Sequence, residues 1–134
     1  MYQHTHQLRP RYGETDQMGF VYYGVYLSYY EVARVESLRY LGLSYKKLEE
    51  AGFWMPVLEN HSKYHAPATY DELLTIKTTI PELPSSRVRF QYEIFGESEK
   101  LLHSGETLLC FLSKGNGCPC RPPKEILEAL KGYF

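Results

Sequence analysis

A chain of 134 residues with 43% hydrophobic and 23% charged residues predicts one globular domain, residues 1–134, and makes long disorder unexpected. The formal net charge of −1 gives no electrostatic basis for nucleic-acid binding. No apolar run approaches the roughly 20 residues that span a membrane. The start, MYQHTHQLRP, lacks the apolar stretch of a secretory signal, so we expect a cytoplasmic location.

The first expected element is a strand at residues 3–12, QHTHQLRPRY, with Pro10 near its end. His4 and His6 would share one face of this strand, a pattern more typical of a solvated face than of a metal site. Gly13 and Gly19 then mark a loop.

A long helix is predicted over residues 22–41, with Gly42 as the residue that stops it. Apolar and tyrosine side chains go nearly all the way round this segment, which is typical of a helix buried on most sides. Glu31 and Arg34 have i,i+3 spacing, and an ion pair between them is expected rather than the alternative, a catalytic role for Glu31.

A short helix is expected over residues 44–52, with Ser44 as a possible N-cap. Four extended segments follow, at residues 53–70, 72–80, 86–96 and 100–113. The alternation in 72–80 and 86–96 predicts an antiparallel sheet with one buried face. A terminal helix is expected within 122–134, after two prolines. The order predicts an α+β fold, with the sheet wrapped around one long central helix.

The three cysteines give little indication of a metal site or of disulfides. Cys118 and Cys120 lie in the turn-rich stretch KGNGCPCRPP with no second ligand pair nearby, which is a weak zinc signal. With Cys110 they do not make a disulfide framework.

Asp16 is the main candidate for chemistry because it lies in the loop before the long helix. Free backbone N–H groups and the positive end of the helix dipole are expected there, where they would stabilise an acyl oxygen that gains charge. A carboxylate beside such an oxyanion hole can attack an acyl carbon or deprotonate water. Gly19 and Gly24 would let the backbone approach a ligand. The alternative is that Asp16 caps the helix or orders its loop.

The stretch RYGETDQMGFVYYGVYLSYYEVARVESLR, with its T-D-x-x-G and E-x-A-R motifs, closely resembles the signature of the 4-hydroxybenzoyl-CoA thioesterase family of hotdog-fold acyl-CoA thioesterases. The segments YHAPATYDELL and SSRVRFQYEIF are also similar to this family. The resemblance implies a hotdog fold and hydrolysis of an acyl-CoA to free acid and CoA, with no metal or redox cofactor. It also implies homotetramers or dimers built from paired sheets, with active sites between two subunits.

Residue roles follow from the same resemblance. It implies that Asp16 is the nucleophile or general base and that the backbone amide of Tyr23 polarises the thioester carbonyl. Val21 is expected beside Gly19 and Gly24 at the substrate. Gly24 stands where the family members that act on hydroxybenzoyl-CoA usually have proline. The resemblance therefore does not decide which acyl group the substrate carries.

Three cations are further candidates for binding CoA. Lys63 alternates with His61 and His65 on one face of a predicted strand, a pattern that suits solvent, a subunit contact or pantetheine. Arg87 and Arg89 lie on the polar face of another strand and could meet the nucleotide phosphates of CoA, or serve only as surface charge.

Rival functions remain at this point. A hotdog hydratase or dehydratase needs a histidine beside the acid, and one common spacing would put it at Val21, which argues against that class. A non-catalytic acyl-CoA-binding protein and a thioesterase acting on acyl carrier protein both stay open.

Overall fold

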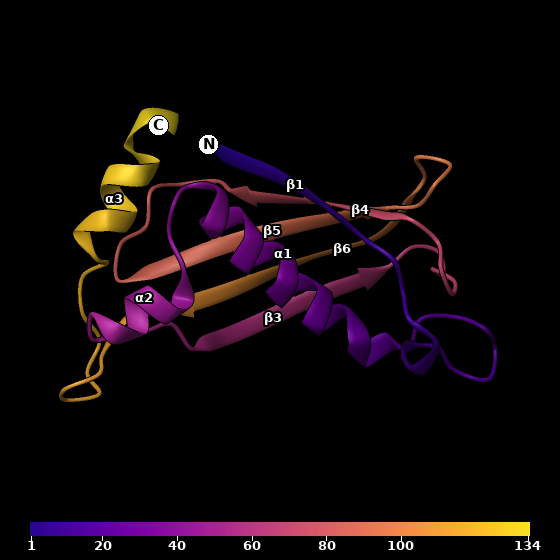
Figure 1. The fold of residues 1–134 in the computed structure, drawn as a ribbon, viewed down its shortest axis with the longest axis horizontal. Coiled ribbons are helices and arrows are strands. Elements are labelled where there is room, and N and C mark those ends of the chain that lie inside the picture. The colour runs from indigo at the N-terminus through magenta and orange to yellow at the C-terminus, as the bar shows by residue number, and fades with distance from the viewer.

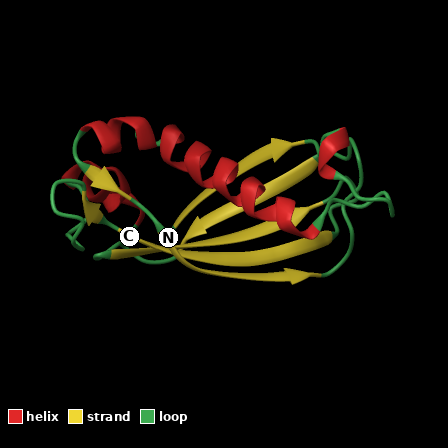
Figure 2. Ribbon diagram, turned by 90° about the horizontal axis from the view of Figure 1, so that it is seen from below, coloured by secondary structure: helices red, strands yellow, loops and turns green.

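The computed structural model describes residues 1–134 and shows a long helix lying across one face of an antiparallel sheet (Figures 1 and 2). Five strands form the sheet: β1 (Tyr2–Leu8), β3 (Val57–Tyr64), β4 (Leu74–Ile80), β5 (Arg87–Phe95) and β6 (Leu101–Cys110). Their order is β1-β4-β5-β6-β3, so β1 and β3 are the edges. A separate pair joins β2 (Phe53–Trp54) to β7 (Leu112–Ser113). The predicted α+β architecture is confirmed.

Three α-helices accompany the sheet: α1 (Tyr26–Tyr40), α2 (Tyr45–Glu50) and α3 (Lys124–Leu130). The helix α1 starts later than predicted, because Tyr22 has extended backbone and Tyr23–Val25 form a 3₁₀ turn that leads into it. Gly42 ends α1 as expected, with φ of +83° and its N–H bonded to the Arg39 carbonyl. None of these helices combines the length and the apolar character that crossing a membrane requires.

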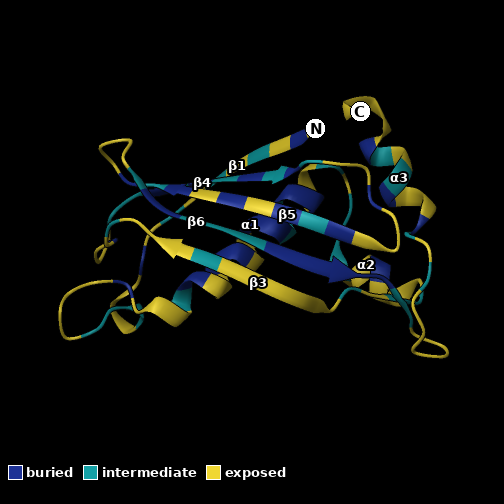
Figure 3. Ribbon diagram, turned by 180° about the vertical axis from the view of Figure 1, so that it is seen from behind, coloured by how far each residue is buried: buried dark blue, intermediate teal, exposed yellow.

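The core lies between α1 and the sheet. Alternate residues of β4 and β5 point to it and are buried: Leu74, Ile76, Thr78, Ile80, Val88, Phe90, Tyr92 and Ile94. The same alternation is visible along β5 from behind, where buried and exposed residues follow one another (Figure 3). The period-two prediction for these strands is therefore confirmed.

The helix α1 is less buried than its sequence predicted. Leu27, Val32 and Tyr40 on its outer side are exposed, so only one face packs on the sheet.

The predicted Glu31–Arg34 ion pair is wrong. Arg34 is buried on the inner face, where its Nε donates to the Tyr45 hydroxyl at 2.8 Å. Its Nη1 donates to the Tyr92 hydroxyl at 3.0 Å, so two tyrosine hydroxyls accept from the guanidinium in place of a carboxylate.

Tyr30 of α1 packs against the middle of the sheet and is hydrogen-bonded to it. Its ring stacks on Tyr92 with centroids 4.1 Å apart, and its hydroxyl contacts Ser62 Oγ at 3.2 Å and the Nε2 of His103. The hydroxyl fits there because β6 has Gly105 at this point. A Cβ on Gly105 would lie 1.8 Å from the Tyr30 oxygen.

Candidate active site

A tight loop presents Asp16. Its backbone N–H donates to the Phe20 carbonyl at 2.8 Å, and its Oδ1 accepts from the N–H groups of Met18 at 2.9 Å and Phe20 at 3.2 Å. Gly19 closes the loop with φ of +80°, a left-handed conformation that favours glycine. One carboxylate oxygen therefore orders the loop, while Oδ2 makes no hydrogen bond within the chain and is available for chemistry.

Glu14 fastens this loop to the helix α1. Its backbone carbonyl accepts from the Tyr22 N–H at 2.9 Å, and its Oε1 accepts from the Tyr29 hydroxyl at 2.9 Å. The Arg11 N–H donates to the same oxygen at 2.8 Å. Burial alone would raise the pKa of Glu14, but the hydrogen bonds from Arg11 and Tyr29 outweigh it and lower that pKa. The ionised carboxylate thus holds the loop and the helix together.

The loop and the start of the helix border an open cavity of about 450 Å³. Asp16, Val21 and Tyr23 all line it, with Phe20, Tyr26 and Tyr64 among the other lining residues. The lining is mainly apolar and Asp16 is its one carboxylate, an arrangement typical of a small-molecule site. Three of the residues predicted for the site are therefore brought together around one cavity.

The turn before α1 offers unpaired backbone donors. Tyr22 and Val25 donate their N–H groups to the carbonyls of Glu14 and Tyr22, each at 2.9 Å. The N–H groups of Tyr23 and Gly24, between them, donate to no acceptor in the chain. Such groups at the positive end of a helix stabilise an oxygen that develops negative charge.

The buried His103 packs against two of the tyrosines that line the cavity. The His103 ring stacks on Tyr26 with centroids 4.1 Å apart and meets the Tyr64 ring edge-on at 4.7 Å. Burial, and then the nearby His65, lower the pKa of His103 to about 4. The imidazole is therefore neutral at pH 7 and packs behind Tyr26 and Tyr64, which line the cavity.

This neutral histidine predicts a loss of stability in mild acid. The pKa of His103 is about 4 in the fold, whereas an unperturbed histidine has a pKa of 6.5, so the unfolded chain takes up the proton first as pH falls. Stability from this group is complete above pH 6.5 and is lost as pH falls toward 4. We expect the free energy of unfolding to be about 1–2 kcal/mol lower at pH 5 than at pH 7. Urea denaturation at the two pH values measures this, and His103→Gln should flatten the dependence. An equal slope in wild type and variant would contradict it.

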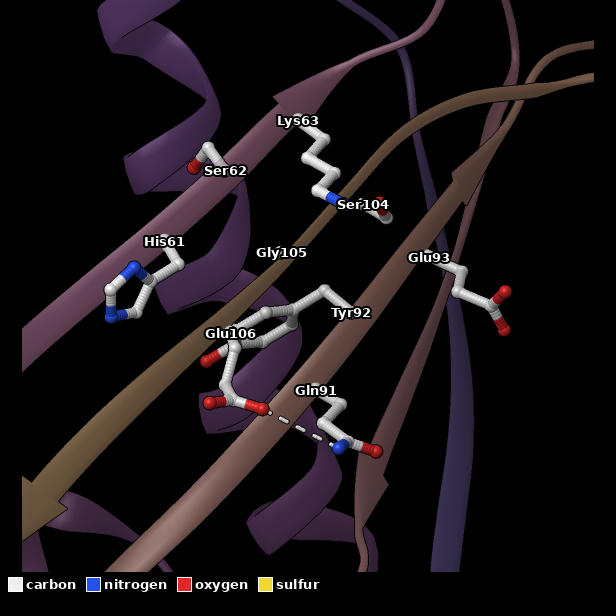
Figure 4. Close-up of a pocket in the computed structure, with 9 residues that line it drawn as sticks. All are labelled: His61, Ser62, Lys63, Gln91, Tyr92, Glu93, Ser104, Gly105 and Glu106. Carbon is white, nitrogen blue, oxygen red and sulfur yellow. Dashed lines mark hydrogen bonds between the residues drawn. The ribbon is translucent and has the colours of Figure 1, made fainter.

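The three predicted cations lie elsewhere. Lys63 lines a polar hollow of about 580 Å³ on the outer face of the sheet, with Gly105 at its floor (Figure 4). Arg87 and Arg89 line a further hollow of about 370 Å³. Arg89 is ion-paired to Glu106 and lies 3.8 Å from Glu82. These three cations do not line the cavity that holds Asp16.

Sequence reasoning missed Tyr26 and Tyr64 as part of the site and left His103 without a role. The Val21 N–H donates to the Ala68 carbonyl at 2.8 Å, so the segment after β3 forms one wall of the cavity. The segment YHAPATYDELL, which resembles the family, contains Tyr64 and was the signal that could have found it.

Comparison with known proteins agrees with this geometry. The thioesterase-like superfamily matches residues 10–130. The acyl-CoA thioester hydrolase YbgC of Escherichia coli is 31% identical over 124 residues, 92% of each chain. The structure of a DHNA-CoA thioesterase from Staphylococcus aureus superposes with a TM-score of 0.93 at 31% identity, covering 99% of this chain and 91% of that one. That of a 4-hydroxybenzoyl-CoA thioesterase variant superposes at 0.85 with 20% identity, covering 96% and 99%, and shares the fold. The chain belongs to the thioesterase-like superfamily and is a thioester hydrolase with the hotdog fold.

Proposed function

We propose that the protein is an acyl-CoA thioesterase that uses Asp16 as nucleophile or general base and the Tyr23 N–H as oxyanion donor. The observation that carries this is that Asp16, which has one carboxylate oxygen without a hydrogen-bond partner, and Tyr23, which has an unpaired N–H, line the same mainly apolar cavity. The names of the relatives in Escherichia coli and Staphylococcus aureus point to the same substrate class.

The proposed reaction follows from these groups. The thioester carbonyl oxygen would accept a hydrogen bond from Tyr23 as the carbonyl carbon is attacked, either by Asp16 itself or by water that Asp16 deprotonates. The carbon–sulfur bond then breaks, and the CoA sulfur leaves and takes a proton. In the first route water later cleaves the acyl–Asp16 anhydride. Both routes give a free acid and CoA.

Substrate binding is proposed for the residues around this centre. Gly19 shapes the loop of Asp16, Val21 lines the cavity, and Gly24 adds a second free N–H beside Tyr23. Lys63 precedes the cavity-lining Tyr64 on β3, and we propose that it meets CoA where the substrate passes over the sheet edge.

The arginines are proposed for the far end of CoA. Arg87 and Arg89 lie farther along the outer face, where they could meet its phosphates. Arg87 is in no ion pair, whereas Arg89 would first have to exchange Glu106 for phosphate.

We also propose a homo-oligomer, with a dimer of dimers as its full form. The edge strand β3 is exposed along most of its length (Figure 3) and has unpaired backbone groups on its outer side. The residues Val57, Leu58 and Leu27 are exposed apolar side chains on β3 and α1. Light scattering after gel filtration is expected to give a multiple of 15.7 kDa. A mass of one chain at micromolar concentration would contradict the proposal.

Release of free thiol from a panel of short, long and aromatic acyl-CoAs tests the function, followed with a chromogenic thiol reagent. We expect turnover of at least one class, with kcat/KM of about 10⁴ M⁻¹ s⁻¹ or more for the preferred acyl group. Hydrolysis of acyl carrier protein thioesters alone would replace the CoA assignment. Binding of acyl-CoA without turnover of any thioester would overturn the catalytic proposal.

A further inference from the structure

We propose that Tyr64 is a positioning residue for the hydrolysis, because it fixes the turn that carries the oxyanion donor. The inference rests on the proposed role of the Tyr23 N–H. The Tyr64 side chain comes from the end of β3 and lines the same cavity as Asp16 and Tyr23. Its hydroxyl donates a hydrogen bond of 2.9 Å to the backbone carbonyl of Tyr23.

This hydrogen bond controls the direction of backbone groups at the turn. In a planar trans peptide the carbonyl and the following N–H point in opposite directions, so fixing the Tyr23 carbonyl also fixes the Gly24 N–H. The peptide plane before it carries the Tyr23 N–H, and its Tyr22 carbonyl accepts from Val25 at 2.9 Å. Both planes that meet at the Tyr23 Cα are thus restrained through their carbonyls, while both N–H groups stay free.

The Tyr64 ring is itself held in place. It packs edge-on against His103 at 4.7 Å and against Tyr26 at 5.4 Å, with interplanar angles of 76° and 83°. His103 is fully buried, and its Nε2 is hydrogen-bonded to the Tyr30 hydroxyl. A series of contacts through His103 and Tyr64 therefore connects the interior of the sheet to the turn.

A side chain that only filled space would not need the hydroxyl. Tyr64 is about half exposed, so its oxygen could be solvated by water, yet it meets the Tyr23 carbonyl. The start of α1 has no side-chain cap that would otherwise restrain this turn. Oxyanion donors act by being preorganised, so loosening the turn is expected to affect the transition state more than the bound substrate.

The test is Tyr64→Phe, which removes the hydroxyl and keeps the ring, assayed as kcat and KM on the best acyl-CoA. We expect kcat to fall about tenfold with KM nearly unchanged, a smaller loss than the roughly 10²–10³-fold that follows removal of an oxyanion donor. Tyr2→Phe is the matched control. Its hydroxyl donates at 2.6 Å to the Ser37 carbonyl of α1, a bond of the same kind far from the cavity, so this variant should keep wild-type kcat.

Each other outcome is decisive. A raised KM with unchanged kcat would mean that the Tyr64 hydroxyl binds substrate directly, and would overturn the positioning role. An unchanged kcat and KM, or an equal loss in Tyr2→Phe, would overturn it as well. Failure of the wild-type protein to hydrolyse any thioester would instead defeat the proposed function, which the same assay shows separately.

Discussion

Asp16→Asn is expected to lower kcat by about 10²–10⁴-fold, the usual contribution of a general base, with little change in KM. The reason is that the substitution separates two roles of one side chain. Asparagine keeps an oxygen that can accept from the Met18 and Phe20 N–H groups, so the loop retains its shape. It loses the negative charge, and with it the ability to attack a carbonyl carbon or take a proton from water.

The matched control is Asp71→Asn, the same chemical change on an exposed loop aspartate outside the cavity. Asp71 has φ of 61°, which asparagine also tolerates, so this variant should keep its fold and its kcat. Steady-state thiol release on all three proteins, with urea denaturation to verify folding, makes the comparison. Wild-type turnover by Asp16→Asn would show that Asp16 serves only to order its loop.

The sheet was predictable from sequence because period-two alternation directly reports which side of a strand is buried. The stop of α1 at Gly42 was predictable for an equally local reason, the left-handed conformation that glycine adopts there. The burial of α1 was not, since tyrosines serve buried and exposed positions alike: Tyr30 is fully buried and Tyr40 is exposed. The i,i+3 spacing along the helix also predicted the wrong partner for Arg34, because tertiary contacts with two tyrosines outweigh an ion pair with Glu31.

The candidate site was predictable only in part. Asp16 and the helix start are neighbours in sequence, so their association follows from local structure. Tyr64 and His103 reach the site through the pairing of β3 with β6, where they are direct partners across the strands. Nothing local to either residue indicates that pairing. The resemblance to the thioesterase family supplied the chemistry that composition could not.

Gly105→Ala is expected to be among the most destabilising single substitutions outside the site, lowering the free energy of unfolding by about 3 kcal/mol. The added Cβ would lie 1.8 Å from the Tyr30 oxygen and 2.7 Å from the His61 carbonyl oxygen. Tyr30 would have to withdraw, losing its hydrogen bonds to Ser62 and His103 and its stacking in the core. Thermal denaturation should show a Tm lower by about 10 °C.

Gly132→Ala provides the matched control, because a Cβ there meets nothing within 4 Å and the glycine has no positive φ. Its free energy of unfolding should stay within about 0.5 kcal/mol of wild type. Adding Tyr30→Phe to Gly105→Ala removes the oxygen that clashes most, so the double variant should lose less than the sum of the two single changes. Strict additivity, or equal losses for the two alanine variants, would mean that Tyr30 does not occupy the gap at Gly105. If the coupling is found, the missing side chain on β6 is what allows α1, and the site at its start, to rest so close to the sheet.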